Sequence, residues 1–281
     1  ASLKAAYTIE EAVMNADVIV MGIPSQQFRA VLEQAKEHIR PWVPIVSLAK
    51  GLEISTKKRM TEIIEEVMPG HPAGVLTGPN LAKEIHFGKA AAAVIAMVDE
   101  TIAGKLKAVF TSGLFRVYTN TDVIGCELGG ALKNIMAIAT GMGDGANAGD
   151  NTRSALITRG IKEIGRLGLN FGAKIETFYG LAGIGDLIAT CGSAHSRNRK
   201  LGERIGKGMS LDNATFNSHM VVEGIKSSFS IKNLSEKYKI EMPICNSVYK
   251  VLYENADPVE EVNALMNRDL KSESIHLSSL S

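Results

Sequence analysis

Residues 125–145 read GCELGGALKNIMAIATGMGDG, and their pattern predicts a buried helix that carries Lys133 and Asn134. Apolar residues recur there at roughly helical spacing, with small residues between them: Cys126, Leu128, Leu132, Ile135, Met136 and Ile138. A lysine in such surroundings loses its hydration unless a partner compensates. A desolvated lysine can exchange a proton near neutral pH, which suits a general acid or base. The plainer alternative is a lysine at a helix end whose ammonium reaches water.

The residues before this helix alternate short apolar runs with helical patterns. The runs predict strands over 17–24, 44–49, 73–77, 90–98 and 115–119. The helical patterns cover 27–40, 56–68 and 100–112, and Thr8 is placed to begin another helix as its N-cap. Apolar strands separated by helices are typical of a largely parallel, doubly wound α/β sheet. We therefore predict a parallel-rich, Rossmann-like domain over residues 1–119.

The pattern changes after residue 120, where only helices are predicted. They cover 122–141, 151–168, 198–207, 222–239 and 244–255. A chain of 281 residues exceeds the usual size of one domain. The sequence therefore predicts a second, all-α domain over residues 120–281.

Composition excludes several classes of protein. The net charge is +1 and aromatic residues are 5%, which argues against a nucleic-acid partner. The sequence contains no run of 18 or more apolar residues, so we predict no transmembrane helix. The three cysteines, Cys126, Cys191 and Cys245, are scattered, and the six histidines lack metal-ligand spacing, so we predict no disulfide framework and no metal site. Free cysteines fit a reducing cytoplasm.

Three predicted strands end in turns of small and polar residues, at 22–25, 49–51 and 77–80. Ligands of open α/β sheets bind at the carboxyl ends of the strands. Glycine and proline also simply stop strands, and both interpretations stay open here. Two glycine clusters, at 141–145 and 183–189, imitate a pyrophosphate loop, but neither follows a core strand. The second is better interpreted as a turn that presents Asp186 at a helix start.

Nine stretches of the chain resemble the bacterial, soluble type of NAD(P)-dependent glycerol-3-phosphate dehydrogenase. The matching stretches occur in the family's order: IPSQQF (23–28), SLAKGLE (47–53), LTGPNLAKEI (76–85), ELGGALKNIMAIATGMGDG (127–145), NTRSALITRG (151–160), GLAGIGDLIATC (180–191), SRNRKLG (196–202), VVEGIKSS (221–228) and LMNRDLKSE (265–273). The resemblance implies hydride transfer between NAD or NADP and C2 of sn-glycerol 3-phosphate or dihydroxyacetone phosphate. It further implies a role in phospholipid synthesis, a cytoplasmic location and a homodimer.

The resemblance also assigns roles to residues. Lys133 is implied as the proton donor and acceptor at the C2 oxygen, with Asp186 holding it; capping a helix is the alternative role of Asp186. The implied substrate contacts are Lys50, Gly78, Asn80, Lys133, Asn134, Asp186, Thr190, Ser196, Arg197 and Asn198. The implied cofactor contacts are Phe28, Lys50, Ala82, Arg197, Val221 and Glu223. Without the resemblance, Arg197 would be assigned to a solvated basic face.

One departure from the family pattern concerns the cofactor. The family begins with a strand–helix–strand unit that carries a glycine-rich pyrophosphate loop, and the present sequence has no such unit. We therefore expect this chain by itself to hold the cofactor poorly, and a catalytically silent chain is one alternative. A related hydroxyacid or 6-phosphogluconate-type dehydrogenase is another. Those enzymes separate the lysine from its asparagine, whereas Lys133 and Asn134 are adjacent here.

Overall fold

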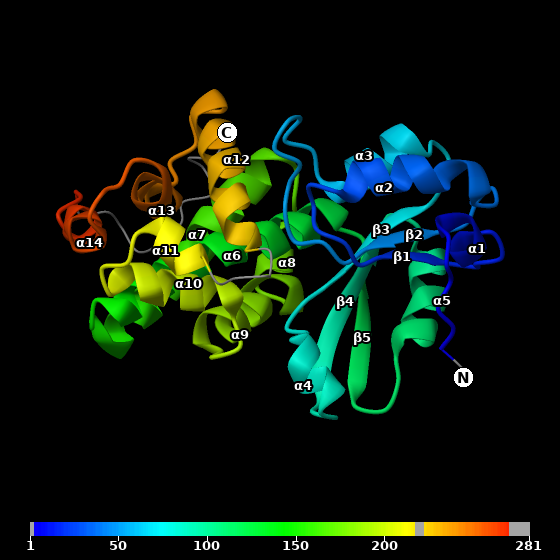
Figure 1. Ribbon diagram of the computed structural model, residues 1–281, viewed down its shortest axis with the longest axis horizontal. Helices are drawn as coiled ribbons and strands as arrows, with labels where there is room; N and C mark the ends of the chain where they lie inside the picture. The colour runs from blue at the N-terminus through cyan, green and yellow to red at the C-terminus, as the bar shows by residue number, and fades with distance from the viewer. Residues whose placement is uncertain (1–2, 217–221, 270–281) are drawn as a thin grey trace.

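The computed structural model describes residues 3–216 and 222–269. A five-stranded sheet with its helices forms one half of the molecule, and a group of helices forms the other (Figure 1). The strands lie in the order β1-β2-β3-β4-β5. They are β1 Ile19–Met21, β2 Ile45–Ser47, β3 Ala73–Thr77, β4 Ala91–Met97 and β5 Phe115–Asn120. The predicted parallel-rich sheet is confirmed, because β1–β2, β2–β3 and β4–β5 are parallel pairs.

One pair departs from the parallel pattern. Strands β3 and β4 are antiparallel, with Thr77 opposite Val94. A parallel pair needs a connection that crosses a face of the sheet. Here the connection holds only the short helix α4 Ala82–His86, which was not predicted and lies at the end of the two strands (Figure 1). The chain therefore returns from the edge at which β3 ended.

Helices cover both faces of the sheet, as in a doubly wound fold. Helix α2 Phe28–Ala35, which continues as η1 Lys36–His38, packs with α1 Ile9–Val13 and α3 Met60–Val67 on one face. Helix α5 Glu100–Phe110 packs on the other (Figure 1). Thr8 caps α1 as predicted, since its side chain accepts a hydrogen bond from Glu11 N.

The second half is helical throughout the part that the structure describes. Its predicted helices are α6 Val123–Gly145, α7 Gly149–Asn170, α10 Arg197–Gly206, α12 Glu223–Lys237 and α13 Pro243–Tyr253. The helix start predicted at Asp186 is confirmed by α9 Asp186–Gly192. Three short helices and a π-helical turn were not predicted: α8 Ile175–Phe178, η2 Leu181–Gly185, α11 Leu211–Thr215 and α14 Pro258–Met266. The elements α8, η2 and α11 contain too few turns for a periodic pattern to reveal them.

Helix α6 connects the two halves through its packing. Its first turns, at Val123 and Cys126, pack on Val75, Val94 and Ala96 of the sheet. Its later turns form the centre of the helical core. By length and composition α6 could cross a membrane, but 94% of its apolar window is buried inside the protein, as in the core helix of a globular domain.

Glycines on α6 and α10 bring these two helices into close contact. A Cβ on Gly202 would lie 2.1 Å from the Ile138 carbonyl oxygen, and one on Gly141 would lie 2.1 Å from the Arg199 carbonyl oxygen. No side chain fits at such distances, so glycine permits the approach of the two backbones. The glycines at 141–145 thus lie within a helix and pack against another. This contact sets where α10 begins, and with it the segment 196–198.

Candidate active site

Lys133 lies in the middle of α6, far from either helix end, and is 5% exposed. Its ammonium donates to Asp186 Oδ1 and, over 2.7 Å, to Thr190 Oγ1. Asp186 begins α9 and Thr190 follows it by four residues, so both side chains lie on one face of that helix. The alternative of a lysine whose ammonium reaches water at a helix end does not hold.

Asp186 lies between two ammonium groups. Its second oxygen, Oδ2, accepts a hydrogen bond of 2.8 Å from Lys50 Nζ. Lys50 follows β2, and its ammonium also donates to the Gly78 carbonyl oxygen at 3.0 Å and to Asn80 Oδ1 at 2.9 Å. Strands β2 and β3 are parallel, so their carboxyl ends meet at one edge of the sheet. Residues from two strand ends and two helices therefore converge at the junction of the two halves.

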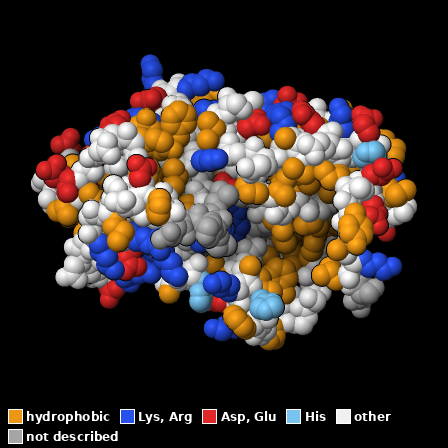
Figure 2. All heavy atoms as spheres, viewed as in Figure 1, with side chains coloured by type: hydrophobic (Ala, Val, Ile, Leu, Met, Phe, Trp, Pro, Cys, Tyr) orange, Lys and Arg blue, Asp and Glu red, His pale blue; other side chains and the backbone are white. Residues whose placement is uncertain are grey.

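Burial and charge set the proton affinities of this group. Burial, and next the positive charge of Lys50, lower the pKa of Lys133 to about 7. For Asp186, burial by itself raises the pKa, but Lys50 and Lys133 together outweigh it and leave the pKa lowered. Asp186 is thus an anion near neutral pH, while Lys133 can gain or lose a proton there. Figure 2 shows Lys and Arg atoms set below the surface near the junction of the two halves.

A chain of amides connects this group to the next helices. Asn134 Nδ2 donates to the Lys50 carbonyl oxygen at 3.0 Å, and Asn134 Oδ1 accepts from Asn198 Nδ2 at 3.0 Å. Asn198 Oδ1 in turn accepts from Gly224 N at 3.0 Å. Each amide uses a donor and an acceptor, so their orientations are mutually determined. Asn134 therefore links the backbone of Lys50 to α10 and α12.

The segment 196–198 begins α10. Ser196 is its N-cap and accepts from Arg199 N at 3.2 Å, and Ser196 is buried. Arg197 occupies the first helical position and is exposed. The unpaired N–H groups and the dipole of a helix start favour an anion. The structure thus places Asn198 in the amide chain, and Ser196 and Arg197 beside it.

The residues implied for the cofactor lie in different surroundings. Phe28 is fully buried, and its ring packs in the core between α2 and the sheet. Ala82 is exposed at the start of α4. Glu223 accepts from Ser25 N at 3.1 Å and from Ser25 Oγ at 2.7 Å. Val221 lies outside the described residues.

Ser25 is a residue of the site that sequence reasoning did not single out. It follows β1, is 1% exposed, and connects that strand end to Glu223 of α12. Its position in the turn at 22–25 was a signal, but its partner is 198 residues away along the chain. Among the described residues, no group of three His, Cys, Asp or Glu side chains is placed to hold a metal ion.

The arrangement suits proton transfer to an oxygen that gains negative charge. A buried ammonium with a pKa of about 7 can supply such a proton, and two cations beside one carboxylate stabilise charge that develops within their reach. Lys50 comes from the sheet half and Lys133 from the helical half. Both halves are therefore required to build the site.

Family models cover most of the chain. Residues 1–103 match the model described as NAD-dependent glycerol-3-phosphate dehydrogenase N-terminus, and residues 122–263 match that of the C-terminus. A protein of Sphingopyxis alaskensis named glycerol-3-phosphate dehydrogenase (NAD(P)+) 2 is 58% identical over 250 residues, which are 89% of this chain and 75% of that protein. A namesake from Clostridium acetobutylicum is 47% identical over 271 residues, 96% of this chain and 82% of that protein.

A solved structure agrees with these matches. The crystal structure of glycerol-3-phosphate dehydrogenase from Coxiella burnetii superposes with a TM-score of 0.91 at 36% identity, over 94% of this chain and 81% of that one. The chain belongs to the NAD-dependent glycerol-3-phosphate dehydrogenase family.

Proposed function

We propose that this protein transfers a hydride between NAD(P)(H) and C2 of sn-glycerol 3-phosphate or dihydroxyacetone phosphate, and so supplies glycerol 3-phosphate for phospholipid synthesis. The observation that carries the proposal is the buried Lys133, with a pKa lowered to about 7, held by Asp186 beside Lys50. Family membership supports the choice of substrate and cofactor.

The residues present fit the reacting end of such a cofactor. Reduction of a ketone needs a hydride at carbon and a proton at oxygen, and an ammonium with a pKa of about 7 at the strand ends suits the second requirement. The nicotinamide, when bound, supplies or accepts the hydride. Among the residues implied for it, Glu223 lies on the helical side of the junction, where it binds Ser25. Lys50 and Ala82 lie on the sheet side. Phe28 is buried in the core behind the turn at 22–25.

In the reducing direction, Lys133 donates a proton to the C2 oxygen as that oxygen becomes an alkoxide. Its charge first stabilises the alkoxide, and its proton then completes the hydroxyl. In the oxidising direction, neutral Lys133 takes the hydroxyl proton. Asp186 holds the Lys133 ammonium, and Thr190 completes its orientation. Asn134 and Asn80 fix Lys50 from both halves.

For the substrate phosphate we propose Ser196, Arg197 and Asn198, with Gly78 lining the opposite side. A hydroxyl, a guanidinium and the start of α10 suit a phosphate dianion.

We further propose a domain boundary between residues 119 and 120, a homodimer and a cytoplasmic location. The three free, buried cysteines fit a reducing compartment. Light scattering of the purified protein tests the dimer.

Replacing Lys133 tests the function. Lys133→Ala in the full-length protein removes both the proton and the stabilising charge, so kcat should fall by roughly a thousandfold. A small alkylamine added to the assay should restore part of the rate. The matched control is Lys174→Ala, because Lys174 is exposed on the helical half. Near-normal turnover of the Lys133 variant would assign the proton transfer to another group.

A further inference from the structure

The loop that carries Lys50 is anchored in both halves of the molecule. This Lys50 loop comprises residues 48–59, between β2 and α3. Its Leu52 is 2% exposed and belongs to the core of the helical half rather than to that of the sheet. Its Arg59 pairs with Glu127 of α6 at 2.7 Å. The position of Lys50 therefore depends on how this loop is held from the sheet side as well.

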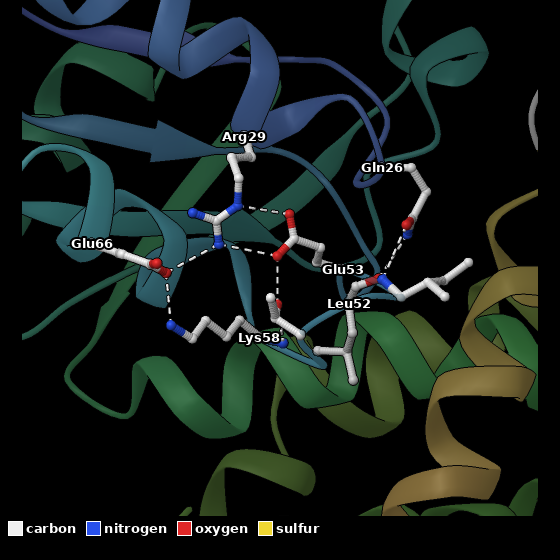
Figure 3. A network of polar contacts seen from close by, with 8 residues as sticks. Gln26, Arg29, Leu52, Glu53, Lys58 and Glu66 are labelled. Carbon is white, nitrogen blue, oxygen red and sulfur yellow. Dashed lines mark hydrogen bonds and ion pairs between the residues drawn. The ribbon is translucent and has the colours of Figure 1, made fainter.

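From the sheet side, the loop backbone is held by Gln26, the residue after Ser25. Gln26 Nε2 donates to the Leu52 carbonyl oxygen at 2.8 Å, and Gln26 Oε1 accepts from Ile54 N at 3.0 Å. Figure 3 shows Gln26 reaching the Leu52 backbone. One primary amide thus binds two backbone groups of the loop, a carbonyl and an N–H, as a neighbouring strand would. This needs a donor and an acceptor on the same side chain. Gln26 Nε2 also lies 3.1 Å from Ser25 Oγ, the hydroxyl bound to Glu223.

A separate ionic network holds the far side of the same loop. Arg29 binds Glu53 through two hydrogen bonds of 2.9 and 3.0 Å, and Arg29 also reaches Glu66 at 3.0 Å (Figure 3). Lys58 Nζ donates to Glu66 at 2.7 Å. These contacts fix the shape of the loop, whereas Gln26 holds its backbone two and four residues after Lys50. The two anchors are therefore distinguishable by mutation.

We propose that Gln26 is a positioning residue that, by holding the backbone of Leu52 and Ile54, keeps the Lys50 ammonium on Asp186, Asn80 and Gly78. The inference rests on the proposed roles of Lys50 and Lys133. Gln26 does not touch the reacting groups, and it acts through the loop. Because Lys50 is a source of the lowered pKa of Lys133, a displaced Lys50 should also let that pKa rise.

Gln26→Glu isolates the donor half of the amide. The variant keeps the length of the side chain and the acceptor for Ile54 N, but it turns a carboxylate oxygen toward the Leu52 carbonyl oxygen. We expect a loss in kcat/KM of roughly tenfold, because the partly buried Leu52 carbonyl oxygen loses its donor and faces a negative charge. Gln26→Met removes both hydrogen bonds without a charge and should show the same loss. The matched control is Gln27→Glu, since Gln27 is exposed and its side chain does not cap α2.

Two measurements separate positioning from a general structural defect. In a Lys50→Ala background, Gln26→Glu and Gln26→Met should add little further loss, because the residue through which they act is gone. In the glycerol 3-phosphate oxidation assay, Gln26→Met should move the acidic limb of the kcat/KM profile to higher pH. Circular dichroism confirms that each variant is folded.

The outcomes that contradict the inference are specific. Gln26 variants as active as Gln27→Glu, or losses that simply add to that of Lys50→Ala, would show that Gln26 does not act through Lys50. Retained turnover in Lys133→Ala, by contrast, contradicts the proposed function and not the role of Gln26 in holding the loop.

Discussion

Lys133 is buried in a helix, and neighbouring residues accept the hydrogen bonds of its ammonium. Asp186 and Thr190 accept its hydrogen bonds, and Lys50 shares the same carboxylate. With Lys133 neutral, Lys50 and Asp186 balance each other; with Lys133 charged, the group carries one excess positive charge. That excess is what burial and Lys50 oppose, and it is the reason that the pKa of Lys133 is lowered to about 7.

This balance predicts opposite pH dependences for the two directions of the reaction. Oxidation needs neutral Lys133, so its kcat/KM should rise with pH through about 7. Reduction needs charged Lys133, so its kcat/KM should fall with pH through the same value. Steady-state assays between pH 5 and 10 check this, with buffers of constant ionic strength. A limb that stays in Lys133→Ala would belong to another group.

The same shift predicts a stability effect. The folded-state pKa of Lys133 lies below the ordinary value of 10.5, so the unfolded chain binds the proton more tightly between these values. This group therefore makes the free energy of unfolding rise as the pH increases from about 7 toward 10.5.

Individual residues differ in how far the sequence could reveal them. Lys133 stands out as an ammonium in an apolar helical pattern, and Asp186 as an acid at a helix start. Ser25 and Gln26 have no such local signature, because their partners lie far along the chain: Glu223 for Ser25, and Leu52 and Ile54 for Gln26. An amide that binds loop backbone becomes visible only once the loop is folded.

At the scale of elements, the strands and long helices could be predicted because each spans several periods of its pattern. The antiparallel β3–β4 pair could not, since strand direction depends on where the connection runs, and α4 lies at the strand ends. The helices α8 and α11 could not be predicted, because each contains too few turns for a periodic pattern. The close approach of α6 and α10 was present in the sequence only as scattered glycines.

The α6–α10 contact makes a testable difference between two glycines. Gly202→Ala would place a Cβ 2.1 Å from the Ile138 carbonyl oxygen, so the two helices must separate. We expect a loss of roughly 1–3 kcal/mol in the free energy of unfolding, as for other overpacked cores. Because α10 carries the proposed phosphate segment, KM for glycerol 3-phosphate should also rise. Urea denaturation and substrate titration measure the two effects.

The control is a glycine in open space. Gly104 lies inside α5, and a Cβ there meets no atom within 4 Å. Gly104→Ala should therefore stabilise the protein by about 0.5–1 kcal/mol, since alanine restricts the unfolded chain. Equal stability of the two variants would mean that the helices can shift apart at no cost.

At the scale of the whole molecule, the two halves contact each other where α6 packs on β3 and β4, and where the Lys50 loop and α3 meet the helical core. A buried polar contact between the halves is at Glu127 of α6, which accepts from Thr61 N at 3.0 Å and from Arg59 Nη1 at 2.7 Å. Burial raises the pKa of Glu127, and Arg59 offsets part of this effect. Glu127 is only 7% exposed, so the pair is held away from water.

The Glu127 contact should couple the unfolding of the two halves. Glu127→Gln keeps the shape of the side chain but removes the charge that Arg59 and Thr61 bind, at a cost of roughly 1–3 kcal/mol. Calorimetry should then show the melting transition broaden or divide into two, because each half has its own core. Turnover should fall as well, since Lys50 and Lys133 reach Asp186 from opposite halves. Glu65→Gln, an exposed position on α3, is the control and should leave one transition. A single, unshifted transition in the Glu127 variant would show that the apolar contacts of Leu52 and α6 hold the halves together without it.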